Sequence, residues 1–175
     1  DLIDALCARA VSEGWLAEED TQKFVSTDRR ELQDAIDESN IHGWLQGRIH
    51  DGEGRYAALV TTLLQEDANR LQTLKDVAFY TGKEKRTEVP TTAPEAFHQL
   101  DNTLLNGMPC DQVMKVTESN PDKVVWEETQ DLHSSFWNGQ GAYYYDLRAE
   151  LIKGILADSG LTFKQTDTNR YEIIK

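Results

Sequence analysis

The protein has 175 residues, which is enough for one domain with a hydrophobic core of its own. Its 31 acidic residues outnumber its 18 basic ones, and the net charge of −13 opposes binding to DNA, RNA or an anionic membrane surface. No apolar run approaches the roughly 18 residues of a membrane span, so no transmembrane helix is expected. Cys7 and Cys110 are too few for a disulfide framework, and we expect reduced thiols in a cytoplasmic protein.

The N-terminal part of the chain carries helical patterns. Over residues 2–12, apolar side chains recur at helical spacing, and Gly14 follows as a stop signal. Asp28 and Glu31 then have the spacing of a capping box, in which each side chain bonds a backbone amide near the other. This pair predicts a second helix that begins directly after it.

The longest periodic stretch covers residues 42–80 and predicts the central packing helix of the fold. Three glycines interrupt its beginning, and Gly82 is expected to end it. After a charged loop, Thr92 and Glu95 again have capping-box spacing, with a proline in the first turn. They predict a further helix that ends before Gly107.

After Cys110 the pattern changes from helical to mostly β. Two stretches rich in β-branched residues flank a turn at 119–122, and they are the clearest hairpin signal in the chain. A glycine-rich link then leads to an amphipathic helix, and a second hairpin follows. The expected order is a strand over 113–118, a strand over 123–127, a helix over 144–156, and strands over 161–165 and 171–174.

These elements define the expected fold class. The sequence predicts a single α+β domain over residues 1–175, helical over 1–107 and ββαββ over 111–175. The helices of the N-terminal half are expected to pack on one side of an antiparallel sheet. No repeat and no low-complexity tract divides the chain.

Aromatic residues gather in the C-terminal part of the chain and indicate a binding pocket. Three consecutive tyrosines on a helix span about 200° of arc, so they cannot all face the core. Aromatic side chains combine a large apolar area with a polar edge, which suits a pocket wall as well as a core. We therefore predict a pocket between the long helix and the sheet. The ligand-binding candidates are Trp126, Trp137, Tyr143, Tyr144, Tyr145 and Leu151.

The four histidines lie near carboxylates, but their spacing does not build a metal site. Glu95 and His98 are three residues apart, as in di-iron helix bundles, which need a second such motif that this chain lacks. His42 and His50 lie at the polar start of a helix, and His133 lies beside two serines. We expect no bound metal, and these four histidines are the candidates if one binds.

The C-terminal third contains the segments Val124-Val-Trp126, Tyr145 followed by Leu151-Ile-Lys-Gly154, and Arg170-Tyr-Glu-Ile173. Their order resembles the second half of the 4-vinyl reductase-like domains, a superfamily that includes TRAPP vesicle-tethering subunits and haem-nitric-oxide-binding sensors. The resemblance implies helices on one side of an antiparallel sheet, a dimer, an enclosed hydrophobic ligand and a sensory or regulatory role. The chain has no cysteine after Cys110 and no haem-propionate signature, so the resemblance assigns no cofactor.

Three functional classes remain open from the sequence. The first is a small-molecule-binding sensory or regulatory domain that takes a small hydrophobic ligand and forms a homodimer. The second is a small enzyme, with or without a metal, that uses histidine and carboxylate residues. The third is an acidic adaptor or inhibitor of a basic protein partner. No phosphate loop, dinucleotide fingerprint, nucleophile elbow or paired-cysteine zinc pattern narrows this choice.

Overall fold

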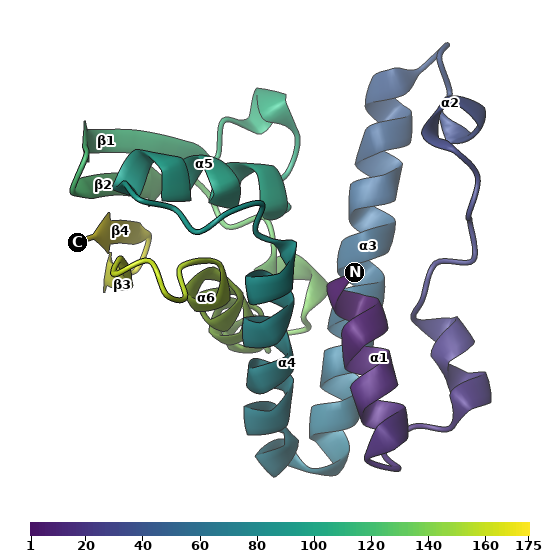
Figure 1. The fold of residues 1–175 in the computed structure, drawn as a ribbon. Helices are drawn as coiled ribbons and strands as arrows, with labels where there is room; N and C mark the ends of the chain where they lie inside the picture. The colour runs from purple at the N-terminus through teal and green to yellow at the C-terminus, as the bar shows by residue number, and fades with distance from the viewer.

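The computed structural model describes residues 1–175, and five helices precede the first strand (Figure 1). In chain order, the elements are α1 (Leu2–Ser12), α2 (Leu32–Ala35), α3 (Ile41–Glu66), α4 (Leu71–Lys85), α5 (Ala93–Thr103), β1 (Met114–Asn120), β2 (Lys123–Glu128), α6 (Ala142–Ile155), β3 (Thr162–Asp167) and β4 (Arg170–Ile174). This order confirms the helical first half and the ββαββ second half that the sequence predicts. Short 3₁₀ segments lie at Glu18–Lys23, Ala68–Arg70, Pro109–Asp111 and Ser134–Phe136.

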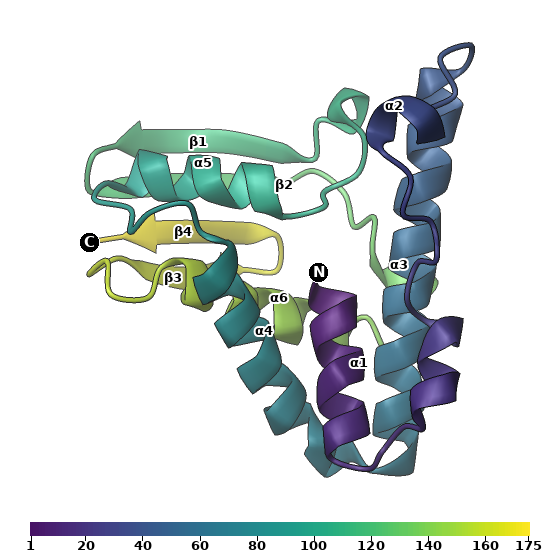
Figure 2. The same cartoon turned by 45° about the vertical axis from the view of Figure 1, so that its right-hand side comes forward.

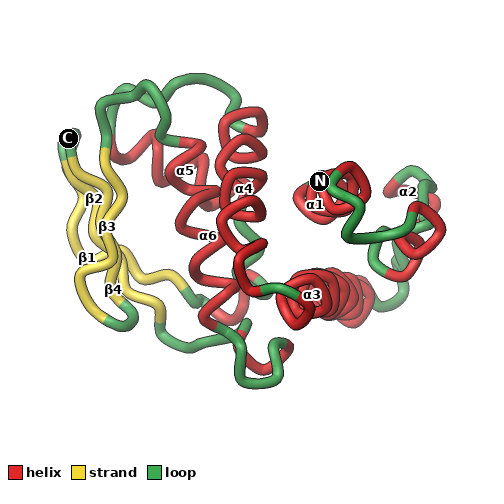
Figure 3. The backbone as a smooth tube through the Cα atoms, turned by 90° about the horizontal axis from the view of Figure 1, so that it is seen from below, coloured by secondary structure: helices red, strands yellow, loops and turns green.

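The four strands form one antiparallel sheet in the order β1-β2-β4-β3. Each hairpin pairs two consecutive strands, and β2 and β4 pair at the centre of the sheet. The register places Val116, Trp126 and Tyr171 beside one another across three strands. The helices lie on one side of this sheet (Figure 3), so the predicted fold class is confirmed.

Helices α5 and α6 cover the inner face of the sheet. Phe97 of α5 packs on Trp126 of β2, with 5.2 Å between the ring centroids. Helix α4 packs along α6, and α1 contacts both α4 and α3. The layers therefore run from the sheet through α5 and α6 to α4, and then to α1 and α3 (Figures 2 and 3).

The predicted central helix is in fact two helices. Helix α3 ends at Glu66, where Asp67 adopts extended backbone and its side chain accepts a hydrogen bond from the amide of Asn69. Helix α4 then begins at Leu71 and packs against α6 and α1. The three early glycines do not interrupt α3, which begins at Ile41 after the N-cap Asn40 and continues through them to Glu66.

Gly82 does not end a helix, which corrects the expectation from the sequence. It lies inside α4, which continues to Lys85. A Cβ atom at Gly82 would overlap the backbone carbonyl of Leu151 in α6, and one at Gly154 would overlap the carbonyl of Phe79 in α4. The two glycines let α4 and α6 approach backbone to backbone.

Other local predictions differ in length from the structure. The helix expected after Glu31 exists, but it is only four residues long and buries none of them. The capping box of Thr92 and Glu95 is present and begins α5, as predicted. No helix of the protein is both long enough and apolar enough to cross a membrane.

Candidate functional site

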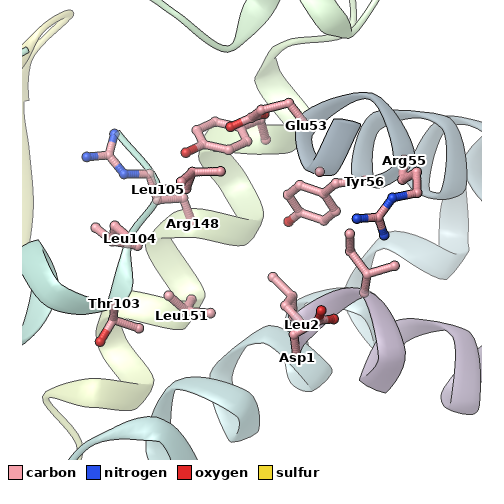
Figure 4. A pocket seen from close by; sticks show the side chains of 13 residues that line it. Asp1, Leu2, Glu53, Arg55, Tyr56, Thr103, Leu104, Leu105, Arg148 and Leu151 are labelled. Carbon is pink, nitrogen blue, oxygen red and sulfur yellow. The ribbon is translucent and has the colours of Figure 1, made fainter. Parts of the chain in front are cut away.

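A pocket of about 300 Å³ lies among four helices, between the N-terminal helices and the ββαββ part (Figure 4). Ligand sites in proteins commonly enclose about 300–1,000 Å³, so this one suits a small molecule. The N-terminal end of α1, the middle of α3, the end of α5 and the face of α6 contribute its walls. The lining residues are Asp1, Leu2, Ile3, Gly52, Glu53, Arg55, Tyr56, Thr103, Leu104, Leu105, Tyr144, Arg148 and Leu151.

Leucine and isoleucine side chains form the apolar part of the pocket. Leu2 and Ile3 come from α1, and Leu104 and Leu105 follow α5 directly. Leu151 closes the side formed by α6 and is itself buried. Leu105 remains 44% exposed, so it lies at the rim where a ligand would enter.

Two pairs of polar side chains form the inner end of the pocket. Glu53 and Tyr56 are three residues apart on α3, and Tyr144 and Arg148 are four apart on α6. Residues at these spacings share one face of a helix, so each helix presents its pair to the pocket. Figure 4 shows Tyr56 extending from α3 toward Leu2 and the space between the helices.

Arg148 forms a buried ion pair with Glu128 of β2. The side chains of Arg148 and Glu128 are 4% and 6% exposed. The guanidinium also lies over the ring of Tyr171, 5.3 Å from its centroid. Burying two charges carries a large desolvation cost, which the pair offsets only through its mutual attraction.

Glu53 is the second buried carboxylate of the site, and it bonds to His133. The Nδ1 of His133 lies 2.8 Å from Oε1 of Glu53, and the two side chains are 4% and 5% exposed. Because a carboxylate only accepts hydrogen bonds, Nδ1 carries the proton and donates. The other carboxylate oxygen of Glu53, Oε2, is buried and has no hydrogen-bond partner.

The loop between β2 and α6 positions His133. Asp131 accepts hydrogen bonds from the backbone amides of His133 at 2.9 Å and Ser134 at 3.0 Å. Burial alone would raise the pKa of Asp131, but its hydrogen bonds, the strongest from Ser134, lower that pKa to about 2. The ring of His133 stacks on Tyr144, with 3.8 Å between centroids.

The hydroxyl groups of the pocket stay protonated. Burial raises the pKa of Tyr56 and the pKa of Tyr144 far above the ordinary value for tyrosine. The carboxylate of Glu53 adds to both shifts, while Arg148 opposes the shift of Tyr144. Each hydroxyl can therefore donate one hydrogen bond and accept others from a ligand.

The predicted ligand-binding residues are distributed between this pocket and the core. Tyr144 and Leu151 line the pocket. Trp137 is fully buried behind it, in edge-on contact with Tyr56 at 5.2 Å between centroids. Trp126 belongs to the core of the sheet, and Tyr143 and Tyr145 are half-buried beside the pocket residues.

The sequence did not place Glu53, Tyr56 or Arg148 in a ligand pocket. Arg148 had a detectable signal, because a charged residue interrupts the apolar face of α6 next to Leu147 and one turn before Leu151. The contributions of α1 and of the segment after α5 had no such signal, since only the tertiary fold brings them together.

The histidines named as metal candidates lie apart from one another. His42, His50 and His98 are exposed, and only His133 reaches the pocket cluster. Glu95 uses its carboxylate to accept hydrogen bonds from Thr91 and Thr92, not to face His98. No group of three or more His, Cys, Asp or Glu side chains is arranged to hold a metal ion.

A second hollow, of about 740 Å³, lies between the end of α5 and the start of β1. Its walls are mostly half-buried or exposed loop residues, and Val113 is the buried one. It contains no buried charged group. The pocket among the helices is therefore the better candidate for specific binding.

No protein-family model matches the sequence, and no curated protein or solved structure is significantly similar to it. The fold and the pocket define an α+β domain with an amphiphilic pocket that opens to solvent on one side.

Proposed function

We propose that this protein is a small-molecule-binding domain with a sensory or regulatory role, and that its ligand occupies the pocket among α1, α3, α5 and α6. The observation that supports this is the combination of an apolar wall with a buried polar end. Glu53 and Arg148 are each about 95% buried, and both have polar atoms without hydrogen-bond partners. Such unsatisfied buried groups are rare in folded proteins, and a bound ligand is one way to satisfy them.

The shape of the site supports a ligand that is mainly hydrophobic. Aliphatic side chains line the outer part, and two tyrosine hydroxyls lie deeper. A few polar groups at one end of an apolar cavity fix the orientation of a bound molecule. The resemblance of the C-terminal third to ligand-enclosing 4-vinyl reductase-like domains agrees with this proposal.

The protein is further proposed to be cytoplasmic and to form a homodimer. Both cysteines are free thiols, which fits a cytoplasmic protein. The resemblance of the C-terminal third to domains that commonly dimerise supports a homodimer. Sedimentation velocity tests the dimer, and a single species of 19.9 kDa at micromolar concentration would contradict it.

Gly52 offers a direct test of the pocket. It lines the cavity from α3, and a Cβ atom there would meet nothing within 4 Å. We expect Gly52→Leu to fill the cavity and abolish binding of 1-octanol, a neutral apolar probe, in isothermal titration calorimetry. The free energy of unfolding should not fall, because replacing a helical glycine gains up to about 1 kcal/mol.

Gly47→Leu is the matched control. Gly47 lies on the same helix, a Cβ atom there also meets nothing, and the residue is not part of the pocket. We expect the same gain in stability and unchanged binding. If 1-octanol binds the Gly52→Leu variant as well as the native protein, or never binds the native protein, the proposed site is wrong.

A further inference from the structure

We propose that the pocket selects ligands with a cationic head, an amine carried on a small apolar body. This inference rests on the proposed function and specifies the ligand class for the same site. It follows from the partners that the arginines and Glu53 have around the pocket, and from the one carboxylate oxygen there that has none.

Both guanidinium groups that line the pocket already have carboxylate partners. Arg55 donates from Nε to Oδ2 of Asp51 at 3.0 Å and from Nη1 to the carbonyl oxygen of Phe24 at 2.8 Å. Arg148 is paired with Glu128 on the side of the sheet. An incoming anion would therefore have to separate Arg148 from Glu128 and leave that buried carboxylate without its partner.

No lysine or arginine side chain pairs with Glu53. Its one side-chain partner is His133, whose Nδ1 lies 2.8 Å from Oε1 of the carboxylate. Oε2 has no partner at all, although Glu53 lines the cavity. An ammonium group at the inner end of the pocket would supply the missing hydrogen bond and place a full positive charge beside the carboxylate.

The two tyrosines beside Glu53 suit the same head group. An ammonium carries three N–H donors, and the hydroxyls of Tyr56 and Tyr144 can accept two of them after Glu53 has accepted one. The faces of tyrosine rings also attract cations. The net charge of −13 favours the approach of a cation at long range and opposes that of an anion.

Three probes of equal chain length isolate the head group. n-Octylamine, 1-octanol and n-octanoate carry a positive, neutral and negative head at neutral pH. We expect calorimetry on the native protein to show octylamine binding at least about tenfold more tightly than octanol, and octanoate binding most weakly. If octanol or octanoate binds as tightly as octylamine, the inference fails while the proposed function stands. If none of the three binds, the proposed function fails as well.

Glu53→Gln assigns the selectivity to its source. The amide keeps an oxygen for the His133 donor but loses the charge, so we expect about a tenfold loss of octylamine affinity and little change for octanol. Glu38→Gln makes the same chemical change at an exposed position just before α3 and should alter neither affinity. An unchanged preference for octylamine in Glu53→Gln overturns the assignment. If that variant does not fold, the three-probe comparison on the native protein still decides the ligand class.

Discussion

Arg148 and Glu128 join α6 to the sheet through charges that are almost completely removed from water. Nε and Nη1 of Arg148 have no hydrogen-bond partner, so the ion pair leaves two buried donors unsatisfied. A buried ion pair of this kind adds little stability compared with well-packed apolar residues, but losing one partner is costly. The pair therefore fixes the position of α6 at the inner end of the pocket, but it stabilises the fold less than a pair of well-packed apolar residues would.

A double-mutant cycle tests this interpretation of the ion pair. Arg148→Met leaves the carboxylate of Glu128 buried and unpaired, and we expect it to cost about 3–5 kcal/mol of the free energy of unfolding. The double variant Arg148→Met/Glu128→Met should recover much of that loss, because no buried charge remains. Urea denaturation measures each free energy. If the loss in the double variant equals the sum of the losses in Arg148→Met and Glu128→Met alone, the two side chains do not stabilise each other.

Asp131 contributes a stability that depends on acidity. Its pKa falls to about 2 in the folded protein, below the ordinary value of about 4 for aspartate. The ionised form is thus favoured by folding, so the contribution is present above about pH 4 and disappears as the pH falls toward 2.

Asp131→Asn keeps an oxygen that can accept the two amide hydrogen bonds but removes this titration. We expect the variant to lose less stability than the native protein between pH 4 and pH 2, measured by denaturation at each pH. Identical pH profiles would mean that the hydrogen bonds to Asp131 do not favour its ionised form.

At the scale of elements, the contact between α4 and α6 depends on two glycines. Gly82 and Gly154 each face a backbone carbonyl of the other helix. The sequence does not distinguish this use from a helix stop, because a glycine after an apolar stripe is typical of both. The capping box of α5 and the turn between β1 and β2 were predictable, since those signals act within a few residues.

Gly82→Ala should destabilise the protein, although alanine is the better helix former. The added methyl group would overlap the carbonyl of Leu151, and such overpacking typically costs about 1–3 kcal/mol. Gly47→Ala is the control on a helix with open space, and it should gain up to about 1 kcal/mol. Denaturant unfolding of both variants measures the difference. Equal gains in the two variants would show that α4 and α6 are not in such close contact.

At the scale of the whole molecule, the pocket lies where the N-terminal helices meet the ββαββ part. Its walls come from segments near residues 2, 53, 104 and 148, which are far apart in the chain. The hydrophobic pattern of the sequence therefore predicts the helices, the strands and the fold class. It also predicts two residues of the pocket, Tyr144 and Leu151. The remaining lining depends on how α1 and α3 dock, which no local spacing encodes.

The most direct test of this account is a titration of ¹⁵N-labelled protein with n-octylamine, followed by amide chemical shifts. We expect saturable shifts concentrated around Leu2, Gly52, Tyr56 and Tyr144, on all sides of one cavity. The Gly52→Leu variant should show none of them, and Gly47→Leu should show them all. Shifts scattered over the surface, or shifts that persist in Gly52→Leu, would contradict the claim that this pocket is the binding site.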